Sequence, residues 1–303
     1  MTSESPAAPF KSGYVALVGA PNAGKSTLMN QILKEKISIA TPKPQTTRNR
    51  IAGILTTTRY QMIFVDTPGI HRAQDEFNKI LVEAALSTLN EVDVICFLID
   101  AQRSEREINR FIVEELKKVA TPIVLVINKI DTIRDKSFLL PIIEEHRSEM
   151  PYKAVFPISA LTGDGVERFT AEIVELLPEG PRYYPEDYLT DQPERFLVAE
   201  LVREKIFHLT HQEVPYAVAV TIDSFSEDPA RRRIDIEATI HVERESQKSI
   251  LIGQKGRMLK EIGTRSRKDI ERLLGCHIFL GLFVRVTKDW RKDPRALADF
   301  GYR

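Results

Sequence analysis

The sequence predicts an α/β domain with a mostly parallel six-stranded sheet and helices on both of its faces, followed by a smaller α+β domain. Through the first 177 residues, short apolar runs alternate with helical patterns, which is typical of a parallel sheet covered on both faces. A break follows at Leu177-Pro-Glu-Gly-Pro, and beyond it the order is one helix, two strands, two helices and one strand. A length of 303 residues suits two domains better than one.

The strands and helices of the first domain are placed by their hydrophobic period. We expect strands over residues 14–18, 50–55, 60–65, 92–100, 123–128 and 154–158. We expect helices over residues 24–33, 76–89, 105–119, 137–146 and 166–177. The short segment 56–59 joins the second and third strands, so this pair is predicted to be a hairpin that places one antiparallel strand at an edge of the sheet.

The second domain begins with a helical pattern over residues 194–209, followed by alternating strands over 216–222 and 234–242 on either side of a polar segment. A Gly-x-x-Gly loop from Gly253 to Gly256 then separates two helices. The expected organisation is a flexible leader over residues 1–11, the first domain over 12–180, a linker over 181–193, the second domain over 194–290 and a C-terminal tail over 291–303.

Composition and charge narrow the class of protein. No stretch approaches the roughly 20 apolar residues that a membrane helix needs. The two distant cysteines, Cys96 and Cys276, are expected to be buried free thiols in a reducing cytoplasm. The net charge is zero, but residues 248–303 contain 14 lysines and arginines against 6 acidic residues. This local excess indicates either a nucleic-acid surface or a solvated helix face.

Residues 19–26 read Gly-Ala-Pro-Asn-Ala-Gly-Lys-Ser, a complete phosphate-binding loop between a strand and a helix. Its glycines let backbone N–H groups curl around phosphate oxygens, and the following helix adds the positive end of its dipole. Lys25 is predicted to reach the β- and γ-phosphates, and Ser26 to bind Mg²⁺. The residues expected to contact the triphosphate here are Gly19, Ala20, Pro21, Asn22, Ala23, Gly24, Lys25, Ser26 and Thr27.

The third strand ends at a second motif, Asp66-Thr67-Pro68-Gly69, which lies 40 residues beyond Ser26. Asp66 is predicted to hold Mg²⁺ through water, and the Gly69 N–H to bond the γ-phosphate and sense its loss. A polar loop over residues 42–48 is expected to supply a further Mg²⁺ ligand, for which we favour Thr47 over Thr46. The predicted catalytic residues are therefore Lys25, Thr47, Asp66 and Gly69, and the predicted Mg²⁺ ligands are Ser26, Thr47 and Asp66.

The fifth strand ends at Asn128-Lys129-Ile130-Asp131, which predicts guanine as the base. The Asp131 carboxylate can accept two hydrogen bonds from guanine N1–H and the exocyclic amine, a pattern that adenine cannot supply. Asn128 would tie the base to neighbouring loops, and the stem of Lys129 would lie over the ring. Backbone N–H groups of Ser159, Ala160 and Leu161 are expected to reach guanine O6. The remaining residues expected at the nucleotide are Thr67, Pro68 and Ile70.

These motifs resemble those of the translation-factor-related bacterial GTPases and, within them, of the Era family. The resemblance runs from about Tyr14 to Tyr302. It rests on the phosphate loop, on Lys-Pro-Gln-Thr-Thr-Arg, Asp-Thr-Pro-Gly-Ile-His and Asn-Lys-Ile-Asp, and on residues 184–187 and 203–206 of the second half. It implies a P-loop GTPase domain joined to a type II KH domain that binds RNA.

The resemblance also implies a role. The chain would hydrolyse GTP, with Mg²⁺, to GDP and phosphate, and would use this cycle to control binding to 16S rRNA near its 3′ end during assembly of the small (30S) ribosomal subunit. It implies a cytoplasmic monomer and leaves open peripheral association with the inner membrane. It further suggests that Asn22 helps to bind K⁺ beside the phosphates.

Ile70 departs from the Ras-like pattern, in which a glutamine at this position orients the attacking water. An isoleucine side chain cannot do so, and no general base is assigned. Phosphoryl transfer then rests on positioning and charge neutralisation, and intrinsic hydrolysis is expected to be slow.

The Gly-x-x-Gly loop predicts the RNA site, because in KH domains this loop clamps about four nucleotides. A plain helix–helix turn would have the same pattern, but here Lys255 is cationic and further cations follow. The residues predicted to bind RNA are Lys248, Ile252, Gly253, Gln254, Lys255, Gly256, Arg257, Lys260 and Arg267. For Trp290 two roles stay open, stacking on a base and packing under a C-terminal helix.

Two other functions are compatible with parts of the sequence. One is an RNA-binding assembly chaperone in which the nucleotide plays a mainly structural role. The other is a GTPase that acts on tRNA modification or on the large subunit. Relatives of that second kind have two GTPase domains or an extra N-terminal module, and one GTPase domain with an intact Gly-x-x-Gly loop argues against them.

Overall fold

The computed structural model describes residues 9–41, 43–44, 46–70, 76–102, 105–228 and 233–302. Residues 1–8 of the expected leader and Arg303 of the expected tail lie outside these ranges. The chain divides into two compact units, which we describe one at a time. The first comprises Met1–Ser38, Thr47–Gln74 and Asn78–Asp191, and the second comprises Ile39–Thr46, Asp75–Phe77 and Gln192–Arg303.

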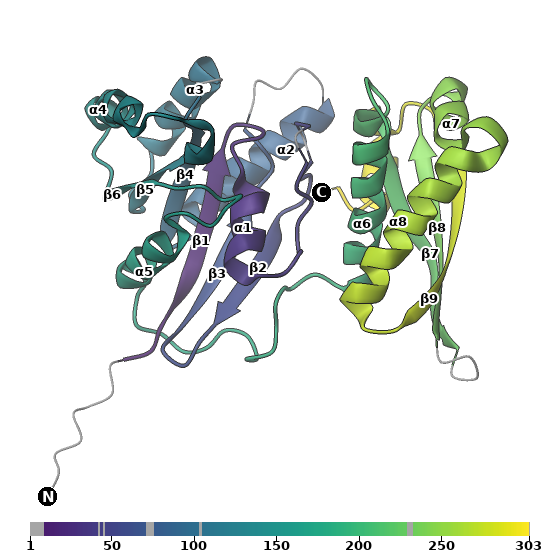
Figure 1. Ribbon diagram of the computed structural model, residues 1–303, viewed down its shortest axis with the longest axis horizontal. Helices are drawn as coiled ribbons and strands as arrows, with labels where there is room; N and C mark the ends of the chain where they lie inside the picture. Colours follow the sequence, from purple (N-terminus) through teal and green to yellow (C-terminus); the bar gives the residue numbers. More distant parts are fainter. Residues whose placement is uncertain are drawn as a thin grey trace, which may run out of the picture. The chain divides into compact units, whose positions relative to one another are not determined.

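The first unit contains a six-stranded sheet in the order β2-β3-β1-β4-β5-β6 (Figure 1). Its strands are β1 (Lys11–Gly19), β2 (Ile51–Thr56), β3 (Tyr60–Asp66), β4 (Val94–Asp100), β5 (Ile123–Asn128) and β6 (Ala154–Pro157). β2 pairs antiparallel with β3, and the other neighbouring pairs are parallel. The structure thus confirms a mostly parallel sheet with an antiparallel edge hairpin.

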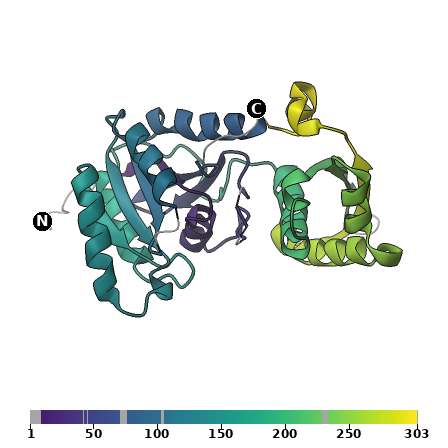
Figure 2. The ribbon, with the colours of Figure 1, turned by 90° about the horizontal axis from the view of Figure 1, so that it is seen from above.

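Helices cover both faces of this sheet, as predicted (Figures 1 and 2). α1 (Lys25–Leu33) and α5 (Val166–Leu176) lie together on one face. The other face carries α2 (Glu76–Ser87), α3 (Arg106–Leu116) and α4 (Leu139–Glu149), which share one apolar core with β1, β4 and β5. Parallel strands end at the same edge of a sheet, so the motifs that follow β1, β3 and β5 are brought together there.

The second unit contains a three-stranded sheet in the order β7-β8-β9. β7 (Ala219–Asp228) runs antiparallel to β8 (Arg233–Val242), and β9 (His277–Val286) runs parallel to β8. α6 (Glu194–Leu209), α7 (Glu245–Ile252) and α8 (Arg257–Leu274) share one apolar core with the sheet, and α9 (Pro294–Asp299) follows β9. This order of elements is the one expected for a type II KH domain.

Strand β7 differs from the expected strand over 216–222. Pro215–Ala217 is a short 3-10 helix, and the strand begins at Ala219 and continues to Asp228 through a bulge between Ile222 and Ser224. The polar residues after the bulge still pair with β8. An antiparallel pair of strands can expose one face to water, so polar side chains do not prevent the pairing. Residues 223–228 of the polar segment are therefore part of the strand β7.

The predicted linker, 181–193, is fastened to the first unit. The buried amide oxygen of Gln61 accepts the N–H groups of Tyr183 (2.7 Å) and Tyr184 (2.9 Å). Further along, the Ile54 N–H donates to the carbonyl oxygen of Leu189 at 2.8 Å. The bond to Ile54 extends the edge of the sheet at β2, and the bonds to Gln61 anchor the chain at β3, so this stretch is ordered.

Two further expectations concern cysteines and membrane segments. Cys96 is a buried free thiol as predicted, whereas Cys276, also free, is half-buried. Burial raises the pKa of the Cys96 thiol far above its usual range, so this thiol stays protonated. Within the described ranges, no helix is both long enough and apolar enough to cross a membrane.

Candidate functional site

The phosphate-binding loop lies between β1 and α1, as the motif requires. The Lys25 ammonium donates to the carbonyl oxygens of Gly19 (3.1 Å) and Ala20 (3.0 Å), which hold it against the loop. Burial lowers the pKa of Lys25 to about 8, against an opposing effect of the Asp66 carboxylate. Gly24 adopts a positive φ of 98°, and a Cβ at this position would collide with the side-chain amide of Asn128. The loop is therefore folded tightly against the base-recognition motif.

A cluster of oxygen atoms lies beside the loop, around Asp66 of β3. Asp66 Oδ2 accepts hydrogen bonds from the hydroxyls of Ser26 (2.6 Å), Ser38 (2.7 Å) and Thr47 (3.2 Å), and Ser26 Oγ is 2.9 Å from Thr47 Oγ1. Asp66 Oδ1 is buried with no hydrogen-bond partner among the described residues. Burial raises the pKa of Asp66, while Lys25 and the three hydroxyls act in the opposite direction.

This cluster fits Mg²⁺, which prefers carboxylate and hydroxyl oxygens. It brings together all three predicted ligands, including Thr47 from the loop after Ile39–Thr46. Ser38 was missed by the sequence analysis. It lies in the apolar segment 37–39, where no motif marks it. Asn30 fixes its position, because the Asn30 side-chain oxygen accepts the N–H groups of Ile37 and Ser38 at 3.0 Å each.

The motif after β3 packs against the phosphate loop. Thr67 Oγ1 donates to the carbonyl of Leu17 at 2.8 Å, and a Cβ on Gly69 would approach the Cα of Pro21 to 2.8 Å, so only glycine allows this spacing. The Ile70 N–H donates to the carbonyl of Gly19 at 3.2 Å. The Ile70 side chain is fully buried in the core with α2 and α3. Ile70 therefore contacts the loop through its backbone, and its side chain lies in the core.

The base-recognition residues converge at the carboxyl end of β5. Asn128 donates to the carbonyl of Ala23 (2.8 Å) and accepts the N–H of Ala160 (2.9 Å), so it joins its own loop to the phosphate loop and to the loop after β6. Ser159 Oγ donates to Asp131 Oδ1 at 2.5 Å and orients that exposed carboxylate. Lys129 pairs with Asp100 at 2.7 Å.

The N–H groups expected to reach guanine O6 are partly engaged. Ser159 donates to the carbonyl of Asp164 at 2.8 Å, and Ala160 donates to Asn128 as above. Of the three predicted residues, Leu161 is the one whose N–H makes no hydrogen bond within the described part of the chain. Its side chain is 74% exposed, so a base could be covered from this side.

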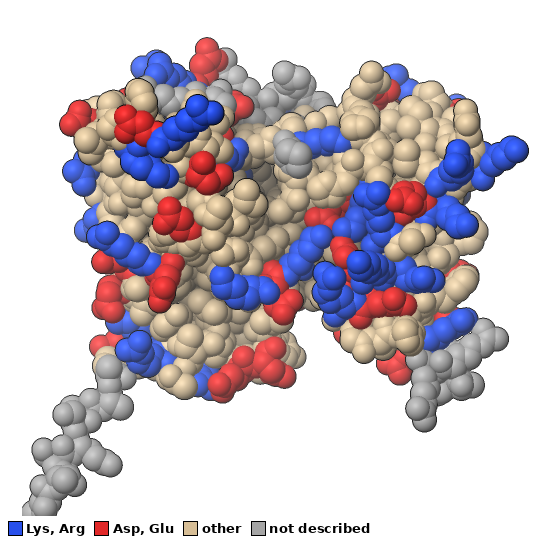
Figure 3. All heavy atoms as spheres, viewed as in Figure 1, with Lys and Arg blue, Asp and Glu red and all other residues tan. Residues whose placement is uncertain are grey.

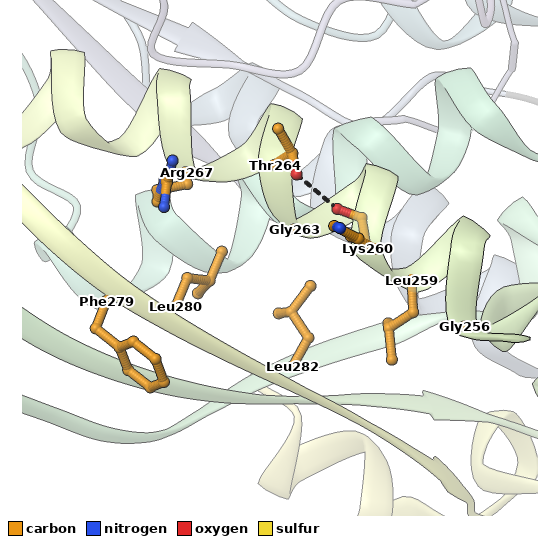
Figure 4. Close-up of a pocket in the computed structure, with 9 residues that line it drawn as sticks. All are labelled: Gly256, Leu259, Lys260, Gly263, Thr264, Arg267, Phe279, Leu280 and Leu282. Atoms are coloured by element: carbon orange, nitrogen blue, oxygen red, sulfur yellow. Dashed lines mark hydrogen bonds between the residues drawn. The ribbon is translucent and has the colours of Figure 1, made fainter.

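In the second unit, the Gly-x-x-Gly loop joins α7 to α8. Gly253 (φ 68°), Lys255 (φ 51°) and Gly256 (φ 76°) all have a positive φ, which turns the chain sharply between the two helices. Beside this loop, α8 and β9 enclose a groove of about 420 Å³ (Figure 4). The residues that line it are Gly256, Leu259, Lys260, Gly263, Thr264, Arg267, Phe279, Leu280 and Leu282.

The comparisons with known proteins cover both units. Residues 14–129 match the family model described as 50S ribosome-binding GTPase, and residues 213–291 match the KH domain. GTPase Era of Syntrophus aciditrophicus is 53% identical over 293 residues, which are 97% of this chain and 95% of that relative. GTPase Era of Geotalea uraniireducens is likewise 53% identical, over 97% of this chain and 98% of the relative. The chain belongs to the GTPase Era family.

Solved Era structures agree with this assignment over 97% of this chain. A crystal structure of Era in complex with MgGDPNP and nucleotides 1506–1542 of 16S ribosomal RNA has a TM-score of 0.94 and 43% identity, and the match covers 97% of this chain and 99% of that one. A crystal structure of a single-residue variant of Aquifex aeolicus Era, bound to GDP and AlF4⁻, matches with the same values. As an Era-family member the chain is a GTPase with a C-terminal KH domain.

Within this Era-family KH unit, the predicted RNA residues separate into two groups. Gly256, Lys260 and Arg267 line the groove. The others lie around the loop and outside the lining: Lys248, Ile252, Gly253, Gln254, Lys255 and Arg257. Lysines and arginines gather over α8 on the face shown in Figure 3, with acidic side chains between them.

The sequence analysis missed the apolar half of the groove. Leu259, Gly263 and Thr264 follow the helical spacing that starts at Gly256, and β9 adds Leu280 and Leu282. The period of 3.6 along α8 would have found the first set. The contribution of β9 could not be predicted from the sequence, because the position of this strand beside α8 is set by the tertiary fold.

The structure also settles the role of Trp290. This side chain is fully buried, and its indole N–H donates to the carbonyl of Ala217 at 3.0 Å. Phe300 and Tyr302 pack against it with ring centroids 5.4 and 5.7 Å away. Trp290 is thus a buried core residue against which the C-terminal segment of this KH unit packs, and it is not available to stack on a base.

Proposed function

We propose that this chain uses GTP hydrolysis to control its binding to 16S rRNA near the 3′ end, during maturation of the 30S subunit. The observation that carries the proposal is that one chain holds two sites. The first is the phosphate loop with the Asp66 oxygen cluster and the Asn128 contacts, and the second is the groove of about 420 Å³ beside the Gly-x-x-Gly loop. The related Era structure with MgGDPNP and a 16S rRNA segment supports it, since both ligand classes are bound there by one protein.

For hydrolysis, we assign the transition-state contacts to the buried cluster. Lys25 neutralises the β- and γ-phosphates, and the Gly69 N–H bonds the γ-phosphate. Ser26 and Thr47 would hold Mg²⁺, which neutralises the developing charge, and Asp66 would orient its water ligands. Because Ile70 supplies no polar group, hydrolysis depends on this positioning and proceeds slowly.

For base selection, we assign Asp131 to guanine N1–H and the exocyclic amine. Ser159 already holds one oxygen of that carboxylate at 2.5 Å, which supports a fixed orientation. Asn128 keeps the phosphate loop and residue 160 in register with it, through its two hydrogen bonds of 2.8 and 2.9 Å. Of the residues proposed for O6, the Leu161 N–H is the best supported.

For RNA, we assign the phosphates to cations and the bases to the groove. Lys255 and Arg257 are exposed at the loop, and Lys260 and Arg267 are exposed along the groove. The groove floor is apolar, as suits unpaired bases and not a duplex. The resemblance to the Era family supports three further parts of the proposal. These are a K⁺ ion beside Asn22, a monomeric state, and a cytoplasmic location, with peripheral association with the membrane as the alternative location.

The competing proposal is an RNA chaperone in which the nucleotide is mainly structural. Thr47→Ala separates the two, with Thr46→Ala as its matched control, because Thr47 alone of the pair reaches the Ser26 and Asp66 side chains in the described contacts. We expect ribosomal RNA crosslinked to the GTP-bound chain to map near the 16S 3′ end, with fewer crosslinks in the GDP state. We expect Thr47→Ala to abolish that difference.

If Thr47→Ala supports 30S maturation as well as Thr46→Ala does, the nucleotide is structural and the switch proposal is wrong. Crosslinks that map to 23S rRNA or tRNA would instead favour the large-subunit or tRNA-modification alternative. Equal turnover in K⁺ and Na⁺ would remove K⁺ from the proposal and leave the rest intact.

A further inference from the structure

The sheet of the second unit has another face, on the opposite side from the groove. Along β9 the even-numbered residues from Ile278 to Val286 belong to the core shared with the helices, so the odd-numbered residues face away from the helices. Figure 4 shows this alternation, with the Phe279 ring on the side of β9 away from α8 and with Leu280 and Leu282 toward it. We call the side away from the helices the outer face.

One end of the outer face is covered by the chain itself. His241 of β8 is buried, and the ring of Phe300 lies against it with the ring centroids 4.3 Å apart. Arg285, which pairs in register with His241, belongs to this end. The rest of the face is open, and there Phe279 is 49% exposed and Phe283 is 57% exposed. Two large rings on one open strand form an apolar patch of the kind that marks an interaction site.

The two rings flank a hollow at Gly281. Phe279, Gly281 and Phe283 are alternate residues of β9, so the rings are attached about 13 Å apart along the strand. A Cβ at Gly281 would meet its nearest neighbours, Cγ of Glu237 and a ring carbon of Phe279, at 3.7 Å, an ordinary contact distance. The fold thus has room for a side chain at this position. A glycine inside a strand is typical of a place where another molecule approaches closely.

The side chains around this hollow are acidic. Glu237 pairs in register with Gly281, is exposed, and makes no hydrogen bond or ion pair within the described part of the chain. Asp223 of β7 is also exposed and is held by a 2.6 Å hydrogen bond from a threonine of β8. Arg233 is neutralised by Asp235, 2.7 Å away. The open part of the outer face is therefore apolar with an excess of negative charge.

We propose that the open part of the outer face docks an extended segment of another protein with the pattern apolar-x-basic-x-apolar. The two apolar side chains would cover Phe279 and Phe283. The basic side chain between them would enter the hollow at Gly281 and pair with Glu237. Alternate side chains of an extended chain are about 6.6 Å apart, so the first and the fifth residue of such a segment match the spacing of the two rings.

RNA and a second copy of this chain are the other molecules that could cover exposed rings. Glu237 and Asp223 act against both, because they repel phosphate groups and also repel the same acidic face of a second copy. The groove takes its β9 floor from Leu280 and Leu282, on the opposite side of the strand. The inference therefore does not depend on the RNA assignment, and the two ligands should be able to bind together.

Three peptides of seven residues serve as probes for this surface. The first has leucine at its second and sixth positions, arginine at its fourth, and serine elsewhere. The second has glutamate in place of the arginine, and the third has the composition of the first with the two leucines adjacent. Fluorescence anisotropy of the labelled peptides measures binding to the full-length chain and to its variants, at low and high salt.

The chain offers variants that separate the apolar contact from the charge. We expect Phe283→Ala to bind the first peptide about tenfold more weakly, as suits the burial of one half-exposed ring. Glu237→Lys should reverse the preference, so that the second peptide binds more tightly than the first, and the reversal should weaken at high salt. Phe138→Ala is the matched control, because it removes a phenylalanine that is 65% exposed in the first unit, and it should bind like the unaltered chain.

The inference is wrong if the unaltered chain does not bind the first peptide, or binds it no better than the second or third. It is equally wrong if Phe283→Ala binds like Phe138→Ala, or if Glu237→Lys keeps the original preference. A single-stranded RNA affinity that falls in Phe283→Ala would give the outer face to RNA. Self-association of the chain that Phe283→Ala abolishes would give it to a second copy. Loss of RNA binding by the unaltered chain would refute the proposed RNA function alone.

Discussion

The nucleotide site and the groove beside the Gly-x-x-Gly loop, to which we assign the RNA, are built in opposite ways. In the nucleotide site, Asp66, Asn128 and Ser159 are buried, and each already makes hydrogen bonds of 2.5 to 2.9 Å to neighbouring residues. In the groove, Lys260 and Arg267 are exposed over an apolar floor. A preorganised polar site places its groups before the ligand arrives, so single changes there cost much. Exposed cations act separately and are screened by salt, so single changes there cost little.

The largest effect expected from this contrast is that of Asp66→Asn. The amide has the same shape but lacks the charge that would stabilise Mg²⁺ and its water ligands, so we expect GTP turnover to fall on the order of 10³-fold. Single-turnover phosphate release measures it. RNA binding by the nucleotide-free variant should be unchanged, and a turnover close to that of the unaltered chain would show that the buried cluster is not the centre of the reaction.

The next effect separates the core of the second unit from its groove. Trp290→Ala removes a fully buried indole and its 3.0 Å hydrogen bond to Ala217, and we expect it to destabilise this unit by about 3–5 kcal/mol. Calorimetric unfolding measures the loss. At temperatures where the variant is folded, RNA affinity should be preserved. A variant of normal stability that binds RNA poorly would return Trp290 to a base-stacking role.

A third change tests base recognition. Asp131→Asn keeps the bond to Ser159 within reach but replaces a carboxylate oxygen by an amide that donates, so we expect GTP affinity to fall about 10²-fold and xanthosine triphosphate to become the better ligand. Competition binding of the two nucleotides measures this. Undiminished preference for GTP would remove Asp131 from the base site.

The contrast also explains how far sequence alone could go. The nucleotide site was predictable because each part is a short motif at a strand end, and the parallel sheet then brings Gly24, Asp66 and Asn128 together. Ser38 escaped, since a single hydroxyl in an apolar segment has no pattern until Asn30 folds it inward. In the groove, cations such as Lys260 were predicted from the sequence. The apolar floor was not, because it depends on which strand lies beside α8.

Lys260→Ala tests the other side of the comparison, the exposed cations of the groove. The side chain is exposed and lines the groove, so its loss should weaken RNA binding about fivefold at about 0.1 M salt and reduce the salt slope by about 0.7, the value for one phosphate contact to a single strand. Lys268→Ala is the matched control, being exposed on α8 but outside the lining. Equal salt slopes for the two variants would contradict a phosphate contact by Lys260.

The smallest effect concerns pH and the second unit. His241 is buried between the hydroxyls of Thr221 and Thr287, 3.0 Å from each, with the Phe300 ring against it. Burial lowers the pKa of His241 below its usual 6.5; Arg285 acts in the same direction, and Asp223 opposes them. The unfolded chain therefore takes up a proton first as the pH falls.

The contribution of His241 to the stability of the second unit should consequently be constant above about pH 6.5 and decline as the pH drops below this value, until the folded histidine is also protonated. Denaturant unfolding followed by fluorescence measures this unit selectively, because Trp290 is the sole tryptophan and is buried there. His241→Gln removes the titrating group and should flatten the decline. A decline equally steep in that variant would assign the pH dependence to other groups and leave the histidine as a packing element only.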